Sequence, residues 1–276
     1  MSLQPLGAGE SEISLALNNR GLAYGDGLFE TMRYVDREIP LWAHHKKRLL
    51  HSLKRLKIKL KEPLLEAELN KVIAATPKNG SRLIKLIVTR GDSDRGYKAN
   101  PKARARLVWQ VLDAPPCYQR PLTLGLCETR LADQPLLAGM KHLNRLEQVL
   151  ARLEWDDKWD DGLMCDYHGR LIESVSANLF LLKGRRLLTP TLEKCGVAGV
   201  MRSYLVERIL PKFNLIVEES SLTLEDLQQS DGLWVCNSVR GLGEVASFEA
   251  ISWERSEIFA DVRQTLNASL HPQWDR

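Results

Sequence analysis

The sequence predicts a mixed α/β protein that is divided into two domains. Strand-like and helix-like runs alternate along the 276 residues, and a proline-rich segment interrupts them. Residues 115–121 contain three prolines, which neither a regular helix nor an inner strand tolerates. We therefore expect an N-terminal domain at 1–114, a linker at 115–121 and a larger C-terminal domain at 122–276.

The first domain is expected to combine strands and helices. Leucines at helical spacing, such as Leu49 and Leu53, indicate an amphipathic helix, and Pro63 favours the first turn of another. Short apolar runs rich in β-branched residues indicate strands. The expected strands are 28–35, 83–89 and 105–112, and the expected helices are 43–57 and 62–75.

The second domain repeats this mixture after the linker. Hairpin turns are expected at 167–170 and 183–185, and Thr223 with Asp226 forms a capping pattern at a short helix. The expected strands are 122–128, 213–219, 232–237 and 244–249, and the expected helices are 141–156, 197–210, 223–229 and 255–268.

Composition favours a globular enzyme over a binding protein for polyanions. Hydrophobic residues make up 44% and charged residues 27% of the chain, and the formal net charge is only +4. Residues 44–61 hold eight Lys or Arg with interspersed leucines, which leaves a basic helix for RNA or an anionic membrane surface as a distant alternative. The region lacks the aromatic residues that single-strand binding uses.

Targeting and cysteine patterns indicate a cytoplasmic protein. No apolar run approaches the roughly 20 residues that span a bilayer, and residues 1–7 have no basic segment typical of a signal peptide. The five cysteines are scattered without the spacing of zinc ligands, so we expect no metal site and no disulfide framework. A reducing compartment follows from this expectation.

Three segments carry groups that pyridoxal 5'-phosphate (PLP) enzymes need. Lys141, at the start of the expected helix 141–156, supplies an amine, and Glu173 supplies a carboxylate on a strand-like run. The glycine-containing junction at 196–202 leads into a helix, whose N-terminus attracts phosphate. Arg48 offers a bidentate cation. Each feature alone also fits an ordinary solvated side chain or a simple helix start.

The order of these segments resembles the fold-type IV PLP enzymes, with their D-amino-acid aminotransferase-like fold. That group contains branched-chain and D-amino-acid aminotransferases and 4-amino-4-deoxychorismate lyases. The resemblance runs from 19–31 to 235–237. Within the group, 139–148 and the loop with Thr89-Arg90-Gly91 are similar to the lyases, and the tyrosine that follows the lysine in branched-chain aminotransferases is absent.

The resemblance implies a cofactor and a role for individual residues. Lys141 matches the lysine that carries PLP, Glu173 the partner of the pyridine nitrogen, and Arg48 the phosphate-binding arginine. The full implied cofactor set is Lys141, Glu173, Arg48, Val197, Ala198, Gly199, Asn237 and Ser238. The candidates for substrate contact are Tyr24, Thr31, Arg90, Tyr97, Arg106 and Asn144, with Arg95 and Lys98 as further loop cations.

The activity that the resemblance implies is a β-elimination. 4-Amino-4-deoxychorismate would lose its enolpyruvyl group to give 4-aminobenzoate and pyruvate, a step of folate biosynthesis, with Lys141 as the general base. The alternative is an aminotransferase acting on branched-chain or D-amino acids, which uses the same cofactor residues. A homodimer is also implied, and neither nucleic acid nor membrane is an expected partner.

Overall fold

The computed structural model describes residues 15–93 and 96–275, which form two compact units. The first unit contains the chain to Pro115 together with Met140–Asn144, and the second contains Pro116–Gly139 and Arg145 onward. The domain boundary expected at 115–121 stays a prediction. A single cut there does not describe the units, because the short segment 140–144 belongs to the first.

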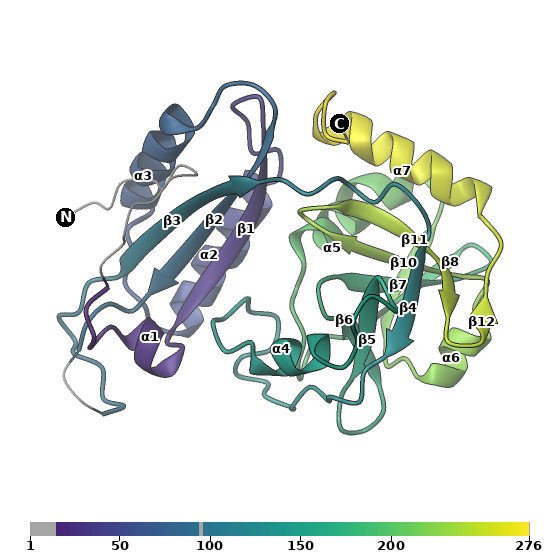
Figure 1. Cartoon of the computed structure of the whole chain (residues 1–276), viewed down its shortest axis with the longest axis horizontal. Coiled ribbons are helices and arrows are strands. Elements are labelled where there is room, and N and C mark those ends of the chain that lie inside the picture. Colours follow the sequence, from purple (N-terminus) through teal and green to yellow (C-terminus); the bar gives the residue numbers. More distant parts are fainter. Residues whose placement is uncertain (1–14, 94–95, 276) are drawn as a thin grey trace. The chain divides into compact units, whose positions relative to one another are not determined.

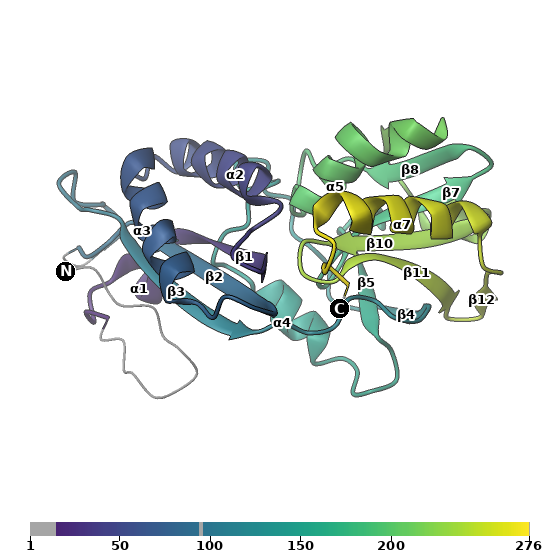
Figure 2. The same cartoon turned by 90° about the horizontal axis from the view of Figure 1, so that it is seen from above.

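The first unit is a three-stranded antiparallel sheet with helices (Figure 1). Its elements are α1 (Arg20–Tyr24), β1 (Gly27–Val35), α2 (Trp42–Arg55), α3 (Glu62–Ala75), β2 (Ser81–Thr89) and β3 (Arg106–Asp113). The strand order is β1-β2-β3, and Figures 1 and 2 show α2 and α3 on the same side of this sheet. Both helices and all three strands confirm the sequence-based expectation within a few residues.

The basic helix α2 has the pattern of an ordinary surface helix. Leu49 and Leu53 are buried, as the helical spacing requires. Lys46 lies 2.9 Å from carboxylate oxygens of both Glu62 and Glu66 in α3. The leucines therefore serve the core of this unit, and neighbouring acidic groups offset part of the positive charge.

The second unit is built on a mixed nine-stranded sheet. Its strands are β4 (Leu122–Leu126), β5 (Asp161–Cys165), β6 (Leu171–Ser174), β7 (Asn178–Lys183), β8 (Arg186–Pro190), β9 (Ile216–Ser220), β10 (Gly232–Asn237), β11 (Gly241–Phe248) and β12 (Ile251–Ser252). The order is β6-β5-β4-β11-β10-β7-β8-β9, with β12 on β11. Because β6 also contacts β7 and β8, the sheet curls around its own core.

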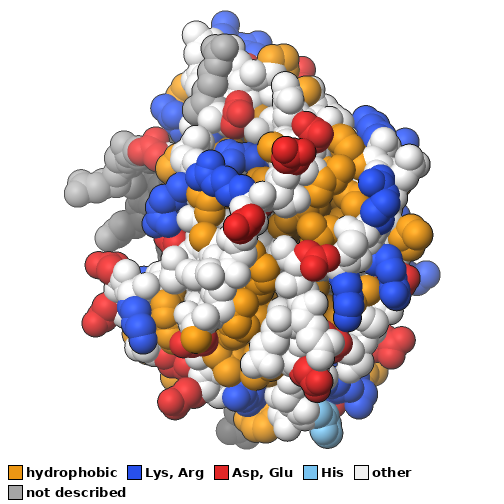
Figure 3. All heavy atoms as spheres, turned by 90° about the vertical axis from the view of Figure 1, so that its right-hand side faces the viewer, with side chains coloured by type: hydrophobic (Ala, Val, Ile, Leu, Met, Phe, Trp, Pro, Cys, Tyr) orange, Lys and Arg blue, Asp and Glu red, His pale blue; other side chains and the backbone are white. Residues whose placement is uncertain are grey.

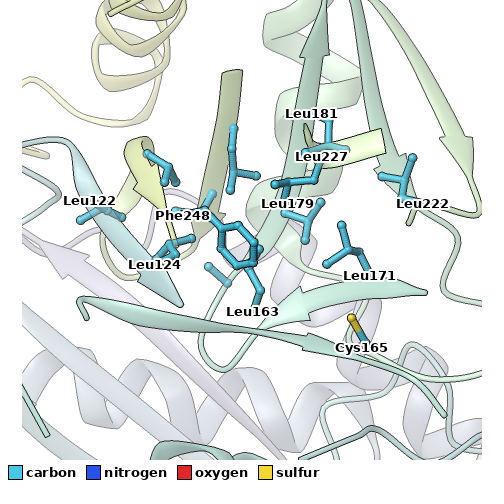
Figure 4. Close-up of a cluster of buried hydrophobic side chains, with 14 of the residues drawn as sticks. Leu122, Leu124, Leu163, Cys165, Leu171, Leu179, Leu181, Leu222, Leu227 and Phe248 are labelled. Atoms are coloured by element: carbon cyan, nitrogen blue, oxygen red, sulfur yellow. The ribbon is translucent and has the colours of Figure 1, made fainter. Parts of the chain in front are cut away.

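Alternate side chains of these strands fill the core inside the curled sheet. Leu163 and Cys165 of β5 and Leu179 and Leu181 of β7 are two residues apart, as one face of a strand requires. Figure 4 shows them meeting Phe248 and other apolar side chains. Burial of this cluster removes apolar surface from water and stabilises the unit.

Helices pack against the same sheet, and the helix at Leu224–Gln228 adds Leu227 to the inner core cluster. They are α4 (Leu146–Arg152), α5 (Val200–Tyr204), α6 (Leu224–Gln228) and α7 (Glu257–Leu270), with a π-helical turn η1 (Leu205–Ile209) and a 3-10 turn η2 (Leu210–Phe213) continuing α5. Trp234 of β10 packs edge-on against Phe259 of α7, with ring centroids 5.3 Å apart. Met164 and Ile172 face a second cluster with Ala151 of α4.

Two local expectations have clear outcomes. Thr223 and Asp226 form the capping box at α6, with each side chain accepting the other's backbone N–H, which confirms the sequence pattern. The expected single helix at 197–210 is wrong in detail, because its regular α-helical part ends at Tyr204. Pro211 cannot donate a backbone hydrogen bond and lies in the closing 3-10 turn.

Surface charge is mixed, and the cysteines are buried. On the face drawn in Figure 3, basic and acidic side chains lie interspersed among apolar and uncharged ones. The structure describes all five cysteines, and each is a buried thiol that forms no disulfide. Along the described ranges, no helix combines the length and apolar character needed to cross a bilayer. Residues 1–7, on which the signal-peptide expectation depends, lie outside those ranges.

Candidate active site

Lys141 lies on an extended segment, so the expectation that it begins a helix at 141–156 is wrong. The Phe29 N–H donates to the Lys141 carbonyl at 2.9 Å, and the Leu143 N–H donates to the Gly27 carbonyl at 3.1 Å. The segment thereby adds to the free edge of β1 in antiparallel register. These tertiary hydrogen bonds override helix propensity, and α4 begins only at Leu146.

This pairing fixes where the Lys141 amine lies. Residues that are opposite each other in an antiparallel pair project from the same face, and Lys141 is opposite Phe29. The Lys141 Nζ accordingly lies 4.6 Å from the centroid of the Phe29 ring. Lys141 is half-buried. An ammonium group over an aromatic face is attracted to the ring, so Phe29 helps to hold the Lys141 side chain in this position.

Gly27, the last residue of Gly25-Asp26-Gly27, leaves room for the chain segments that pack around it. A Cβ on Gly27 would lie 2.4 Å from the Val88 carbonyl oxygen and 2.8 Å from the Leu143 side chain. Both distances are too short for a carbon atom. A larger residue at this position would therefore collide with the backbone of β2 and press on the Leu143 side chain of the lysine segment.

A buried triad of Glu30, His45 and Arg48 occupies the opposite face of β1. Glu30 alternates with Phe29 along the strand, so it points to the other face, toward α2. Arg48 forms a two-point ion pair with Glu30, with 2.9 Å between its Nε and the Glu30 Oε1. The His45 Nδ1 lies 2.7 Å from the Glu30 Oε2. Arg48 was predicted to bind phosphate, and its Glu30 partner was not predicted.

Electrostatics assign charges to this triad. Burial alone would raise the pKa of Glu30, but the Arg48 charge and the hydrogen bond from His45 outweigh it and lower this pKa to about 2. Burial lowers the pKa of His45, a shift that Glu30 only partly offsets. We conclude that His45 is neutral and donates Nδ1–H to Glu30. The His45 Nε2 is buried and has no hydrogen-bond partner among the residues that the structure describes.

In the second unit, Glu173 is buried at the end of β6 and fixes a loop. Its Oε2 accepts the Val197 N–H at 2.8 Å, and the Asn178 side chain donates to the Val197 carbonyl at 2.8 Å. The Gly139 N–H donates to the Gly196 carbonyl, and the Ala198 N–H donates to the Gly139 carbonyl. The carboxylate and the 196–198 loop are therefore held as one arrangement.

The same hydrogen bonds reduce the number of N–H groups that could bind phosphate at Val197, Ala198 and Gly199. The first two N–H groups already donate within the protein, so the donors that remain at this junction are those of Gly199 and the first turn of α5. A Cβ on Gly199 would lie 1.8 Å from the Asn178 Oδ1. Only glycine fits there, which keeps the backbone open at the helix start.

Asn237 supports the turn that presents Ser238. Its Oδ1 accepts the N–H groups of Val239 at 2.9 Å and Arg240 at 2.7 Å. Its Nδ2 reaches the Tyr118 hydroxyl at 3.3 Å. The Asn237 side chain is therefore engaged in shaping the turn, and a direct phosphate contact by Ser238 stays a prediction.

Arg90 and Arg106 were predicted to contact the substrate, and both form hydrogen bonds with other groups of the protein. Arg90 makes four hydrogen bonds with its five N–H donors, two to Asp26 and two to the carbonyls of Leu56 and Lys57. Arg106 is paired with Asp92 through Nε at 3.2 Å and Nη2 at 2.5 Å. Sequence alone does not reveal these partners, because they are far apart along the chain.

Tyr24 and Tyr97 contact each other in the first unit. Their ring centroids are 5.5 Å apart, and the Tyr24 hydroxyl accepts the Gly96 N–H at 3.1 Å. Arg20 donates to the carbonyls of Gly96 and Tyr97, each at 3.0 Å. Arg20 was not predicted, although it stands in the Asn19-Arg20-Gly21 motif. It anchors this loop, in which Arg95 lies outside the described residues.

Thr31 and Asn144 flank the Lys141 segment in different ways. Thr31 is half-buried and shares the sheet face of Phe29, since the two residues are two apart on β1. Asn144 donates to the Gly25 carbonyl at 3.2 Å, so it helps hold the end of the lysine segment to the glycine turn.

A cluster of Asp133, Asp166 and Cys195 has the spacing of metal ligands, but basic side chains already form ion pairs with its carboxylates. Their ligand atoms lie within 4.8 Å of one another. Arg170 forms an ion pair with Asp166, and Lys194 lies 3.4 Å from Asp133. Burial raises the pKa of the Cys195 thiol to about 12, so it is not a thiolate ligand. We interpret the cluster as a partly buried ion-pair network.

The fold and these groups define a class IV aminotransferase-type protein, and comparison with known proteins agrees. The family model described as "Amino-transferase class IV" matches residues 27–248, and the chain belongs to this family. The expected two-domain fold-type IV architecture is thereby confirmed.

Three relatives indicate where in the family the chain lies. It is 36% identical to an aminodeoxychorismate lyase of Vibrio harveyi, over 88% of this chain and 90% of the relative. The crystal structure of 4-amino-4-deoxychorismate lyase from Pseudomonas aeruginosa is 40% identical, with a TM-score of 0.89 and coverage of 95% of this chain and 98% of that chain. A putative branched-chain-amino-acid aminotransferase of Methanocaldococcus jannaschii is 29% identical, over 96% of each.

The donor set fits PLP, on which this family depends. The first unit offers a half-buried amine against an aromatic ring and an arginine fixed by a buried carboxylate. The second offers a buried carboxylate and a helix start that only glycine keeps open. An amine, a carboxylate and anion-binding donors are the kinds of group that the cofactor requires, and the role of each residue stays a prediction.

Proposed function

We propose that this protein converts 4-amino-4-deoxychorismate to 4-aminobenzoate and pyruvate, as a PLP-dependent lyase of folate biosynthesis. The observation that carries the proposal is the half-buried Lys141, which β1 holds by backbone bonds against Phe29. The two lyase relatives, at 36% and 40% identity, favour this activity over transamination.

PLP, when bound, supplies an electron sink for the negative charge that proton removal creates. Lys141 would hold its aldehyde carbon, and Glu173 would keep a proton on its pyridine nitrogen. Arg48, the N–H groups near Gly199 and the Ser238 hydroxyl would bind its phosphate. Glu173 suits its role because it is buried and its carboxylate is oriented by the Val197 N–H.

Lys141 would then act as a general acid and base. Its free amine removes the proton from the ring carbon that bears the substrate nitrogen, and the neighbouring C–O bond to the enolpyruvyl group breaks. The ring becomes aromatic, which makes the elimination favourable. Lys141 returns the proton to the departing enolpyruvate to give pyruvate. Atoms balance without water or an added oxidant.

Pyruvate release without a keto acid tests this activity. Purified protein supplied with PLP and 4-amino-4-deoxychorismate should release one pyruvate per substrate consumed. An aminotransferase would require a keto acid acceptor and would leave the enolpyruvyl ether intact.

Lys141→Ala should abolish both pyruvate release and the cofactor absorbance of the protein. Lys71→Ala, at an exposed lysine paired with Glu68, is the matched control and should keep both. Full turnover by Lys141→Ala would contradict the proposal.

We also propose that the partner of this chain is a second copy of itself. The exposed side of α4 carries four leucines or valines at helical spacing, and the exposed fractions of Leu146 and Leu153 are 75% and 76%. Val149 and Leu150 lie between them, with 51% and 55% exposed. A contiguous apolar face of this kind is typical of a protein interface.

The double change Leu146→Glu with Leu153→Glu should halve the mass measured by light scattering. Ile216→Glu, at an apolar residue that is 60% exposed on β9, should leave the mass unchanged. A monomeric wild-type protein would refute the homodimer. We further propose a cytoplasmic location, which five cysteine thiols without a disulfide support.

A further inference from the structure

Asp161, at the start of β5, is a buried carboxylate that has no assigned role in the cofactor site. The residue is only 7% exposed. The hydroxyls of Ser174 and Ser176 each donate to its Oδ2 at 2.7 Å, and the Gly162 N–H donates to its Oδ1 at 2.9 Å. Burial raises the pKa of Asp161, and these donors offset part of the rise. Since a buried carboxylate is costly, its complete set of donors indicates a specific structural task.

The two serines lie in the tight turn that joins β6 to β7. The Ser174 N–H donates to the Ala177 carbonyl at 2.7 Å, and the Ala177 N–H donates to the Ser174 hydroxyl oxygen at 2.9 Å. The Val175 N–H donates to the Gly162 carbonyl at 2.9 Å, which joins the turn to β5 through the backbone as well. Asp161 therefore receives two hydroxyls from one turn and holds that turn against β5.

This turn connects the two residues that hold the 196–198 loop. Glu173 is the last residue before the turn, and Asn178 is the first residue after it. The Glu173 carboxylate accepts the Val197 N–H, and the Asn178 amide donates to the Val197 carbonyl, both at 2.8 Å. Because Glu173 and Asn178 are the immediate chain neighbours of the turn, a shift of the turn would move both side chains.

The same turn is hydrogen-bonded to the segment that presents Ser238. The Asn237 Nδ2 donates to the Ser176 carbonyl at 3.3 Å. The Asn237 Oδ1 accepts the Val239 N–H at 2.9 Å, so this side chain connects the turn at Ser176 with the turn at Ser238. The turn that Asp161 holds thus lies between the carboxylate assigned to the pyridine ring and the hydroxyl assigned to the phosphate.

We infer that Asp161 is a positioning residue, which fixes the Glu173 carboxylate relative to the Ser238 turn and so sets the geometry of the cofactor site. The inference rests on the proposed roles of Glu173 and Ser238. The pyridine nitrogen and the phosphate belong to one small molecule, so a change in the distance between their partners weakens at least one of the two contacts. Asp161 acts through the turn and is not itself a catalytic residue.

Asp161→Asn tests the inference by titration of the apoprotein with PLP. Asparagine keeps the shape but has one accepting oxygen, whereas the present donors approach both oxygens of Asp161. The dissociation constant of PLP should rise roughly 10- to 100-fold, because a donor is left unpaired and the turn can shift. Asp160→Asn is the matched control, since the Asp160 carboxylate pairs with the exposed Arg120. It should keep the wild-type affinity.

A milder variant keeps the test valid if Asp161→Asn does not fold. Ser176→Ala removes one hydroxyl from a residue that is exposed apart from this contact. It should weaken PLP binding roughly 3- to 10-fold, because one of the hydrogen bonds to Asp161 is lost. Wild-type PLP affinity in Ser176→Ala or in Asp161→Asn would overturn the inference.

A double-mutant cycle separates positioning from a general loss of stability. If Asp161 acts through Glu173, the effect of Asp161→Asn on PLP affinity should be at least roughly 3-fold smaller in the Glu173→Gln background. The absorbance maximum of PLP-loaded Asp161→Asn should also shift toward that of Glu173→Gln, whereas Asp160→Asn should keep the wild-type spectrum. Full multiplication of the two effects on PLP affinity would overturn the inference.

These measurements are independent of the lyase proposal, because they use PLP and no substrate. Absence of pyruvate release by wild type would overturn the lyase activity. PLP titration of the same variants would still report on Asp161.

Discussion

Replacing Glu30 by glutamine tests the buried triad beneath the candidate phosphate site. Glutamine has nearly the same shape but removes the charge that offsets Arg48, whose side chain is only 10% exposed. The pKa of Glu30 falls from 4.5 to about 2 in the folded protein. Each pKa unit corresponds to about 1.4 kcal/mol, so Glu30 contributes on the order of 3 kcal/mol to folding near neutral pH.

The sign of the pH dependence follows from the lowered pKa. The stabilisation is complete above the unfolded value of 4.5 and is lost as the pH falls through the folded value of about 2. Glu30→Gln should therefore be less stable than wild type by about 3 kcal/mol at pH 7. The difference should shrink when both proteins are compared near pH 3, since the unfolded chain then carries a proton on Glu30 that the folded protein does not bind.

Urea unfolding followed by tryptophan fluorescence measures both quantities. Glu68→Gln is the control, because Glu68 pairs with an exposed lysine on the surface of α3, and such pairs contribute about 0–1 kcal/mol. A loss below about 0.5 kcal/mol in Glu30→Gln, a surface-pair value, would refute the reasoning. So would a loss that is equal at pH 7 and pH 3.

Two further changes test local features of the second unit. Gly199→Ala should weaken PLP binding and destabilise the protein by about 1–3 kcal/mol, because its Cβ would lie 1.8 Å from the Asn178 Oδ1. Titration of the apoprotein with PLP measures the loss of affinity. A wild-type affinity would contradict the prediction. Thr223→Ala should lower the free energy of unfolding by about 1 kcal/mol, because the capping box with Asp226 is lost. Urea unfolding measures this change, and an unchanged midpoint would contradict it.

Local patterns predicted the elements well, since they depend on neighbours in sequence. The helices α2 and α3 and the strands of both units follow hydrophobic periodicity and proline positions. The capping box at Thr223 is equally local. The segment at Lys141 failed because hydrogen bonds to Gly27 and Phe29, over 100 residues away, hold it extended. Periodicity contains no information about such a partner.

The site residues also divide into those that local sequence patterns indicate and those that depend on contacts between distant segments. The order of Lys141, Glu173 and the 196–202 junction was sufficient to indicate PLP chemistry, and the family comparison agrees. Sequence reasoning missed Glu30, whose contact with Arg48 depends on which face of a strand it occupies. The helical spacing of His45 and Arg48, together with an acidic residue on an adjacent strand, was the available signal for the triad.

The pairing of residues 140–144 with β1 has a consequence for fragments of this protein. A shortened polypeptide that stops at Pro115 keeps β1 but lacks the strand that covers its outer edge. The exposed Phe29 amide and Gly27 carbonyl would then be available to any extended chain, and open edges of this kind promote aggregation. Limited proteolysis or gene truncation at Pro115 should thus yield an insoluble product, which a synthetic peptide spanning 139–145 would help to keep in solution.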